Sequence, residues 1–197
     1  MSDDPLRMYL VLRRGAVTEL AHAGVLAGVA AVACVREFAG EPDLEAWRER
    51  PGKVCLRARS PSQWRQVLQE PHVLAGDAVA ALAPRRRSAR GPVLEKLQAM
   101  STDLAPPPAE APGPGLTYLL NPALRMSSGK AVAQIAHAAV MAAERVPHAA
   151  IATARVAVPS AAAFAAARDV VARVEDAGLT EVPPGTVTVV ATWSRER

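Results

Sequence analysis

Cysteine is scarce in this chain of 197 residues, which contains only Cys34 and Cys55, each within an apolar stretch. A structural zinc site needs ligands at paired short spacings and a disulfide framework needs a higher cysteine density, so the sequence excludes both. We expect two buried thiols that act as small apolar side chains. The sequence therefore predicts no metal ion and no other cofactor.

We expect neither an export signal nor an apolar run long enough to cross a membrane. The first fifteen residues begin acidic and hold too short an apolar run for a signal peptide, and charges or prolines interrupt the alanine-rich stretches elsewhere. Half of the residues are apolar, which is enough for one sizeable core or two small ones. We expect a cytoplasmic protein with no membrane partner.

Lysine is rare, with three among 23 basic residues, and Lys130 is the only one in the second half. The net charge of +4 arises entirely in residues 1–100, which carry fifteen Lys or Arg against eleven Asp or Glu, because residues 101–197 carry eight of each. The basic residues are densest at Arg85, Arg86 and Arg87. A surface cluster of this kind attracts phosphate groups, and it is equally typical of a solvated loop in an arginine-rich protein.

The chain has two halves with the same order of predicted elements on either side of a proline-rich segment. Residues 101–115 contain five prolines and no apolar periodicity, which predicts a semi-rigid linker. Each half reads as strand, amphipathic helix, strand, helix and a final strand led by a glycine. Ala-His-Ala tripeptides at His22 and His137 superpose the two long helices, and Pro61 and Pro159 open the two short ones. We therefore expect an internal duplication.

Strands that alternate with helices predict an α/β protein made of two tandem small domains, each a mixed β-sheet flanked by helices. We place these domains at residues 8–90 and 116–197, with the linker at residues 91–115. The segment 164–178 reads as a helix that ends at the glycine of Asp176-Ala177-Gly178.

Two motifs of the second half resemble those of a known enzyme family. Residues 126–139 read MSSGKAVAQIAHAA and residues 176–188 read DAGLTEVPPGTVT. They are similar to the M-x-x-G-K-x-x-A-Q-x-x-H-A and D-A-G-x-T-E-x-x-P-G-T-x-T motifs of type 2 peptidyl-tRNA hydrolases. The second helix is shorter than in that family, and the last strand ends in Ala-Thr-Trp instead of Gly-Pro.

The resemblance implies a tRNA-directed esterase whose second half carries the site. Its implied catalytic residues are Lys130, Asp176 and Thr180, and the substrate-binding residues are Gly129, Gln134 and His137. From their charge, we expect Arg85, Arg86 and Arg87 to hold the tRNA from the first half. Because the family is generally dimeric, the resemblance also implies a monomer whose halves pack as a pseudo-dimer. The first half lacks the chemistry, since Arg14 or Gly15 stands where the lysine is expected and no D-A-G-x-T segment follows.

The residues themselves suit this chemistry. Lys130, Gln134 and His137 share one face of a predicted helix with Lys130 in its first turn, where the helix dipole also favours an anion. Asp176 and Thr180 lie four residues apart in a loop that lets both reach one water molecule. A histidine flanked by alanines is more often structural than catalytic. A phosphate-binding P-loop is excluded, because it requires an earlier glycine and a following Ser or Thr.

We therefore expect hydrolysis of the ester bond of peptidyl-tRNA, or of another N-acyl-aminoacyl-tRNA, without a metal ion. Two alternatives remain open at the level of sequence. One is a non-catalytic RNA-binding or regulatory protein of the same fold. The other is an esterase or amidase that acts on a small molecule, which would suit the neutral second half.

Overall fold

The computed structural model describes residues 4–101, 103–177 and 181–195. The first half builds one sheet and its helices from the following elements: β1 (Leu6–Arg13), α1 (Leu20–Glu37), α2 (Pro42–Glu49), β2 (Gly52–Ala58), α3 (Pro61–Val67), β3 (His72–Ala75), β4 (Val79–Arg86), the 3-10 turn η1 (Arg87–Ala89), α4 (Gly91–Lys96) and β5 (Gln98–Ala99). The second half consists of β6 (Gly115–Leu120), α5 (Ser128–Ala142), α6 (His148–Ala152), β7 (Arg155–Ala157), α7 (Ala161–Ala165), β8 (Val170–Glu175) and β9 (Val187–Ser194).

The two sheets share one topology. The first has the order β3-β4-β1-β2-β5 and the second the order β8-β9-β6-β7. In each, the first two strands along the chain are parallel, and β4 or β9 pairs antiparallel with the first. The first sheet has one more strand, β5, which pairs with β2. The predicted mixed α/β architecture with two sheets is confirmed, and the matching connectivity supports the duplication.

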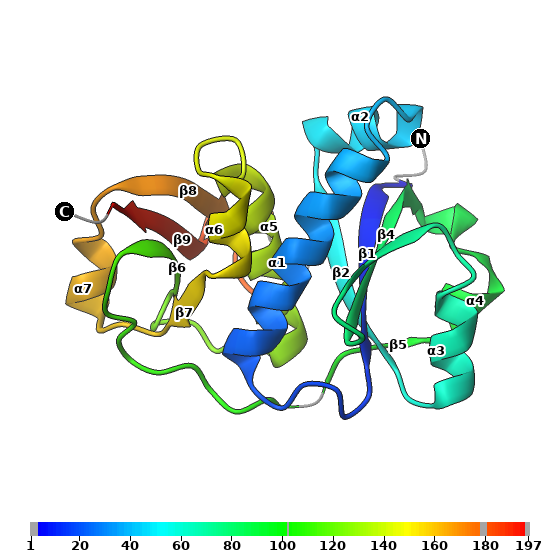
Figure 1. Ribbon diagram of the computed structural model, residues 1–197, viewed down its shortest axis with the longest axis horizontal. Helices are drawn as coiled ribbons and strands as arrows, with labels where there is room; N and C mark the ends of the chain where they lie inside the picture. Colours follow the sequence, from blue (N-terminus) through cyan, green and yellow to red (C-terminus); the bar gives the residue numbers. More distant parts are fainter. Residues whose placement is uncertain (1–3, 102, 178–180, 196–197) are drawn as a thin grey trace.

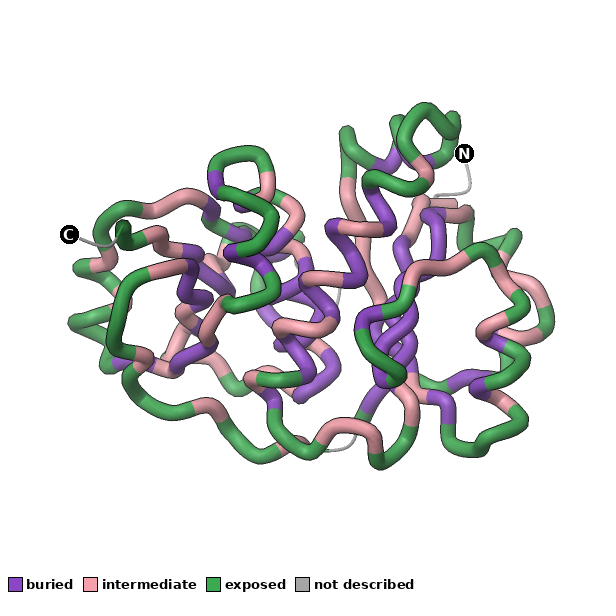
Figure 2. Tube along the Cα trace, in the orientation of Figure 1, coloured by how far each residue is buried: buried purple, intermediate pink, exposed green. Residues whose placement is uncertain are grey.

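Helices α1 and α5 pack against each other between the two sheets (Figure 1). Gly24 and Gly28 allow this close approach, because a Cβ atom at Gly24 would lie 2.5 Å from Cδ1 of Ile135 and one at Gly28 would lie 2.9 Å from Cβ of Ala139. One apolar core runs through α1, α5 and the inner face of both sheets (Figure 2). A smaller core lies on the other face of the first sheet, around Trp64.

The long helices superpose differently from the sequence prediction. Leu12 of β1 pairs with Val79, and seven residues later Glu19 is the N-cap of α1; Leu120 pairs with Val189, and seven residues later Ser127 is the N-cap of α5. Strand register and helix start therefore agree on one alignment. In this alignment His22 corresponds to Lys130, because each is the third residue of its helix. The predicted match of His22 with His137 is therefore wrong by two helical turns.

The segment 164–178 is not one helix. Helix α7 ends at Ala165, and residues Val170–Glu175 form strand β8. Ala172 and Val174 are buried while Arg173 and Glu175 are exposed, which is the period of two that a half-buried strand requires. Pairing with β9 overrides the alanine-rich helical pattern, so Asp176 follows a strand and is not a helix C-cap.

The proline signals are confirmed in one half only. Pro61 is the first residue of α3, after the N-cap Ser60, whose hydroxyl accepts a hydrogen bond from the Gln63 N–H. In the second half Ser160 is the N-cap, and Pro159 lies outside the helix.

The linker is shorter than predicted and is bound to both halves. Residues 91–99 form α4 and β5, and β5 pairs with β2, so the first half extends to residue 99. Further along, the Leu104 N–H donates to Oγ of Ser128, and Ala105 O accepts from the Leu20 N–H. Neighbouring linker residues thus contact the first residue of both long helices, so the two helix starts lie at the same end of the molecule.

Helix α1 is long and apolar enough to cross a bilayer, with a mean hydropathy of 1.4 over 18 residues. The prediction that charges or prolines interrupt every such stretch is wrong for this helix. Within the structure, 56% of it is buried against other elements. A core helix meets the same criteria of length and composition.

Candidate active site at the start of α5

The first turn of α5 is fixed from two sides. Ser127 is the N-cap, and its hydroxyl accepts a hydrogen bond from the Lys130 N–H. A Cβ atom at Gly129 would lie 2.5 Å from the carbonyl oxygen of Met100, so a larger residue at this position would displace the linker. Gly129, predicted to bind substrate, is buried beneath this carbonyl and has a packing role.

Lys130, Gln134 and Asp176 form one buried group. The Lys130 ammonium makes an ion pair with Oδ2 of Asp176, and Nε2 of Gln134 donates to the same oxygen at 2.6 Å. Only 14% of the Lys130 side chain and 4% of the Asp176 side chain are exposed. The structure therefore brings together three of the predicted site residues, two from α5 and one from the residue after β8.

The backbone of Asp176 is held across the base of the loop 176–186. Its N–H donates to the carbonyl of Thr186, and its own carbonyl accepts from the Gly185 N–H. Gly185 has a positive φ of 76°, which favours glycine. These bonds orient the carboxylate toward α5. Thr180, the third predicted catalytic residue, lies outside the described residues.

Glu181 also contacts the start of α5, although no role was predicted for it. Its carboxylate accepts hydrogen bonds from both the N–H and the hydroxyl of Ser127, each at 2.7 Å. Its negative charge therefore lies at the positive end of the α5 dipole. The signal was present in the D-A-G-x-T-E motif, but only the fold shows that this glutamate meets the N-cap of α5.

The side-chain oxygen of Gln134, Oε1, is buried and has no hydrogen-bond partner among the described residues. A buried acceptor without a partner costs free energy unless another group fills the position. In this site Oε1 is placed one helical turn from Lys130, so it can accept from a water molecule or from an N–H or O–H of a bound substrate.

His137 lies apart from this group, toward the first half. Burial, followed by the nearby Lys53 charge, lowers the pKa of His137 to about 3, so the imidazole is neutral at physiological pH. Lys53 belongs to β2, and its ammonium lies 4.5 Å from the centroid of the Trp47 ring. His137 shares the helix face of Lys130 and Gln134, as the i, i+4, i+7 spacing predicts, but its nearby charged group is Lys53 of the first half.

The Lys53 ammonium is buried, and the sequence predicted no role for it. Its Nζ has no hydrogen-bond partner among the described residues, and burial lowers its pKa to about 7. Cys34 and Cys55 are buried free thiols, as predicted, and burial raises the pKa of each to about 12. A thiol with so high a pKa is not a nucleophile at neutral pH.

Arg85, Arg86 and Arg87 lie at the other end of the first sheet. Arg86 pairs with Leu6 at the beginning of β1, whereas α1 and the linker contacts follow the end of that strand. Seven residues of strand span about 23 Å. Arg85 makes a 2.7 Å ion pair with Glu70, and Arg86 donates to the carbonyl of Asp4. The structure does not bring these arginines to Lys130.

The position that corresponds to Lys130 in the first half belongs to His22, and not to Arg14 or Gly15 as predicted. Exposed His22 replaces Lys130, and Leu26 replaces Gln134 four residues later. The connection between β3 and β4 is a short turn, 76–78, where the second half has the loop 176–186. Asp77 of that turn is paired with Arg13.

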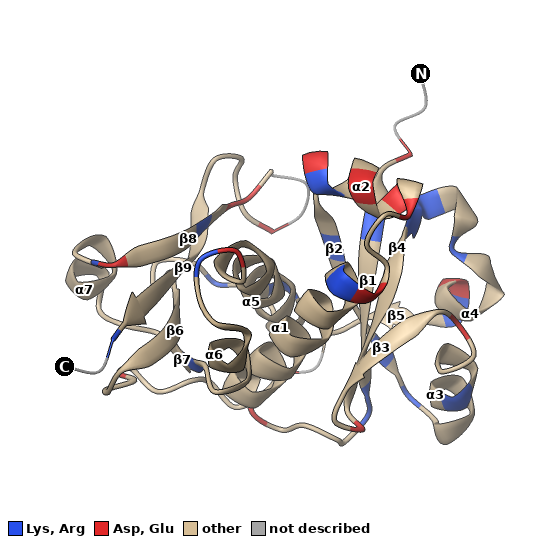
Figure 3. Ribbon diagram, turned by 45° about the horizontal axis from the view of Figure 1, so that its top comes forward, with Lys and Arg blue, Asp and Glu red and all other residues tan. Residues whose placement is uncertain are grey.

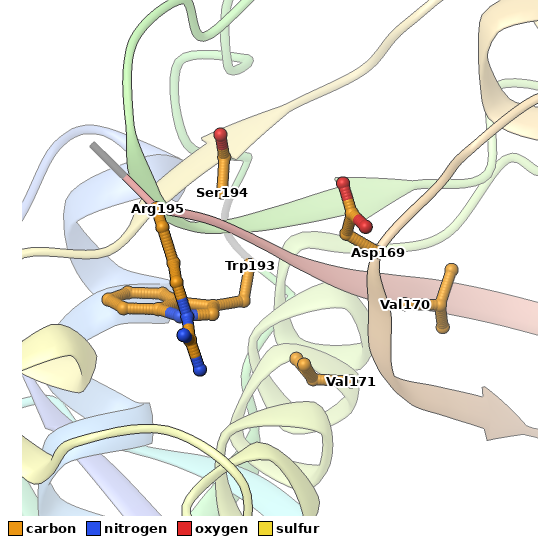
Figure 4. Close-up of a pocket in the computed structure, with 6 residues that line it drawn as sticks. All are labelled: Asp169, Val170, Val171, Trp193, Ser194 and Arg195. Atoms are coloured by element: carbon orange, nitrogen blue, oxygen red, sulfur yellow. The ribbon is translucent and has the colours of Figure 1, made fainter. Parts of the chain in front are cut away.

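A separate pocket lies at the start of β8 and the end of β9, lined by Asp169, Val170, Val171, Trp193, Ser194 and Arg195 (Figure 4). Asp176 follows the opposite end of β8, so this pocket is not part of the Lys130 site. No group of three or more His, Cys, Asp or Glu suited to a metal ion occurs among the described residues. Comparisons of the chain with protein-family models, with curated proteins and with solved structures gave no match.

Proposed function

We propose that the second half hydrolyses the ester bond that joins a peptidyl or N-acyl-aminoacyl group to the 3′ end of tRNA. The observation that carries this proposal is the buried contact of Lys130 and Gln134 with one oxygen of Asp176 at the start of α5. These three residues come from the two motifs that resemble type 2 peptidyl-tRNA hydrolases. A substrate made during translation places the reaction in the cytoplasm.

In the proposed reaction Asp176 orients a water molecule and accepts its proton as the water oxygen attacks the ester carbonyl carbon. The carbonyl oxygen becomes an oxyanion, which the Lys130 ammonium and the positive end of the α5 dipole stabilise. The tetrahedral intermediate then breaks the bond to the ribose oxygen, and the proton on Asp176 passes to that leaving oxygen. The products are a free peptide and tRNA, and Gln134 keeps the carboxylate in position throughout.

We also infer that the chain acts as a monomer in which the two halves take the place of two subunits. Support comes from the common topology, from the packing of α1 on α5 and from the single apolar core across both halves. A solution mass of one chain, 20.7 kDa, is expected by light scattering, and an obligate dimer would contradict this arrangement.

The test uses N-acetyl-aminoacyl-tRNA labelled in the amino acid. The wild-type protein should release the N-acetyl amino acid, and Lys130→Ala should lower kcat by about 100-fold, as for the loss of one oxyanion donor. Asp176→Asn should reduce kcat at least as strongly with little change in KM. Lys96→Ala, an exposed lysine on α4, is the matched control and should retain full activity.

One observation also suits a non-catalytic RNA-binding protein of this fold: the ion pair of Lys130 and Asp176 satisfies the charges of both residues within the protein. That function would appear as tRNA binding without release of the amino acid. An esterase for small molecules would cleave a simple N-acyl ester at the same rate as the tRNA ester. The release assay, together with a tRNA-binding measurement and a simple N-acyl ester as a second substrate, therefore separates all three functions.

A further inference from the structure

We propose that Arg14, Arg57 and Arg59 form the surface that binds the phosphate backbone of the tRNA beside the Lys130 site. The inference rests on the proposed function, because tRNA is the polyanion it invokes. These three residues are called the β-end arginines here, since they lie at the carboxyl ends of the parallel strands β1 and β2.

The β-end arginines lie next to one another. The Arg14 N–H donates to the carbonyl of Ala58 at 2.9 Å, which places Arg14 beside Ala58, the residue between Arg57 and Arg59. Arg14 and Arg59 are exposed and Arg57 is half-buried. Among the described residues none of the three forms an ion pair with a carboxylate, in contrast to Arg13 and Arg85.

A chain of contacts connects this surface to the start of α5. Met100 donates its N–H to the carbonyl of Cys55, and its own carbonyl packs on Gly129, the residue before Lys130. Cys55 faces the core around α1 and α5, whereas Leu56 faces the opposite core. Because side chains alternate along a strand, Arg57 is on the same face as Cys55 and lies two residues, about 7 Å, further toward the strand end.

Both halves direct the carboxyl ends of their parallel strands to this end of the molecule. The linker residues Leu104 and Ala105 contact the first residues of α5 and α1, which follow β6 and β1. In α/β sheets ligands bind outside the carboxyl ends of the strands. Exposed Arg125, in the loop between β6 and α5, adds a positive charge from the second half.

Charge favours a polyanion at this surface. Lys and Arg occur at both ends of the first sheet (Figure 3), but those at the other end are partly neutralised, Arg85 by Glu70 and Arg86 by its contact with Asp4. Near the β-end arginines, Asp77 is already paired with Arg13, and the exposed Glu19 lies at the start of α1. The β-end arginines thus place three positive charges, without a carboxylate partner among the described residues, at the end of β2, the strand that α5 contacts.

The experiment measures the binding of deacylated tRNA by fluorescence anisotropy at several salt concentrations. The triple variant Arg14→Gln/Arg57→Gln/Arg59→Gln should bind about tenfold more weakly at moderate salt, and the slope of log affinity against log salt should fall by about 2, since each phosphate contact contributes about 0.7–0.9. Arg86→Gln/Arg87→Gln is the control at the opposite end and should retain the wild-type slope. An unchanged slope in the triple variant, or a larger loss in the control, would overturn the proposal.

Two further measurements separate this inference from the proposed function. The exposed pair Arg14→Gln/Arg59→Gln keeps the half-buried Arg57, so it should fold normally and lower the slope by more than 1. In the hydrolysis assay the triple variant should raise KM at least fivefold with kcat retained. If wild type binds tRNA through the β-end arginines but releases no amino acid, the proposed function fails and the binding surface stands. If the triple variant is active and its KM is unchanged, the proposed binding surface is wrong, and the proposed function is not affected.

Discussion

Lys130 and Gln134, one turn apart on α5, both contact the same oxygen of Asp176. Both helix side chains stabilise the negative charge of the carboxylate, only 4% of which is exposed to solvent. Breaking a buried ion pair from one side leaves an uncompensated charge, whereas neutralising both partners removes the penalty.

Lys130→Met should therefore lower the free energy of unfolding by about 2–4 kcal/mol at pH 7, and Asp176→Asn by a similar amount. The double variant should lose less than the sum, since neither charge is left alone. Urea unfolding of the four proteins measures this coupling. Additive losses would show that the ion pair does not contribute to stability.

The pKa of Lys53 predicts how stability changes with pH. In the folded protein burial lowers this pKa from 10.5 to about 7, so between pH 7 and 10.5 the unfolded chain binds more protons than the folded one. Stability therefore rises with pH in this interval, and the penalty for the buried charge is fully present below pH 7.

Lys53→Met should increase the free energy of unfolding at pH 6, by an amount on the order of 2–4 kcal/mol, and this gain should shrink toward pH 9. The contact with Trp47 favours the charged form and limits the gain. Urea unfolding at pH 6, 7.5 and 9 measures the difference. Lys96→Met on α4 is the exposed control and should show no such trend. A gain that is equal at all three pH values would contradict the assigned burial of Lys53.

His137 should contribute to acid sensitivity at lower pH. Its pKa falls from 6.5 to about 3 on folding because the ring is buried and Lys53 is near. Below pH 6.5 the unfolded chain therefore takes up a proton that the folded protein does not, so stability should decrease as the pH falls from 6.5 to 3. His137→Gln should flatten this decrease, as followed by thermal unfolding at pH 4 and 6.5. An equally steep decrease in the variant would contradict the prediction.

The sequence predicted the helices and strands that form from their own local pattern. It did not predict an element that becomes a strand only through pairing with another strand. The apolar runs of β1 and β6 and the periodic helices were predictable from their own residues. Strand β8 was not, because its alanine-rich surroundings favour a helix and only its pairing with β9 makes it a strand. The helix superposition failed because an Ala-His-Ala tripeptide in an alanine-rich chain carries little information about register.

In the candidate site, too, some residues were predicted from the sequence and others are shown only by the fold. Motif spacing identified Lys130, Gln134 and Asp176, and the fold brings them together. Lys53 gave no signal, since a lysine near the start of a strand is normally solvated, and only the packing of α5 on β2 shows otherwise. The cluster Arg85–Arg87 was conspicuous by charge density, but strand direction places it at the end of the sheet away from α5.

Helix packing at Gly28 gives the last prediction. An added Cβ would lie 2.9 Å from Cβ of Ala139, and neither atom can move without shifting a helix backbone. Gly28→Ala should therefore destabilise the protein by about 1–3 kcal/mol, although the same change in an uncrowded helix interior would stabilise it by about 0.5–1 kcal/mol.

Ala139→Gly removes the opposing methyl group and is the compensating change. Alone it should cost about 1 kcal/mol or more, from helix propensity and lost packing. Combined with Gly28→Ala it should restore part of the lost stability, because the new methyl group then occupies the space of the old one. Thermal unfolding of the four proteins measures the coupling. If Gly28→Ala stabilises the protein, or if Ala139→Gly fails to compensate, α1 and α5 are not in close contact at this point, and the proposed packing of the two halves as a pseudo-dimer would have to be abandoned.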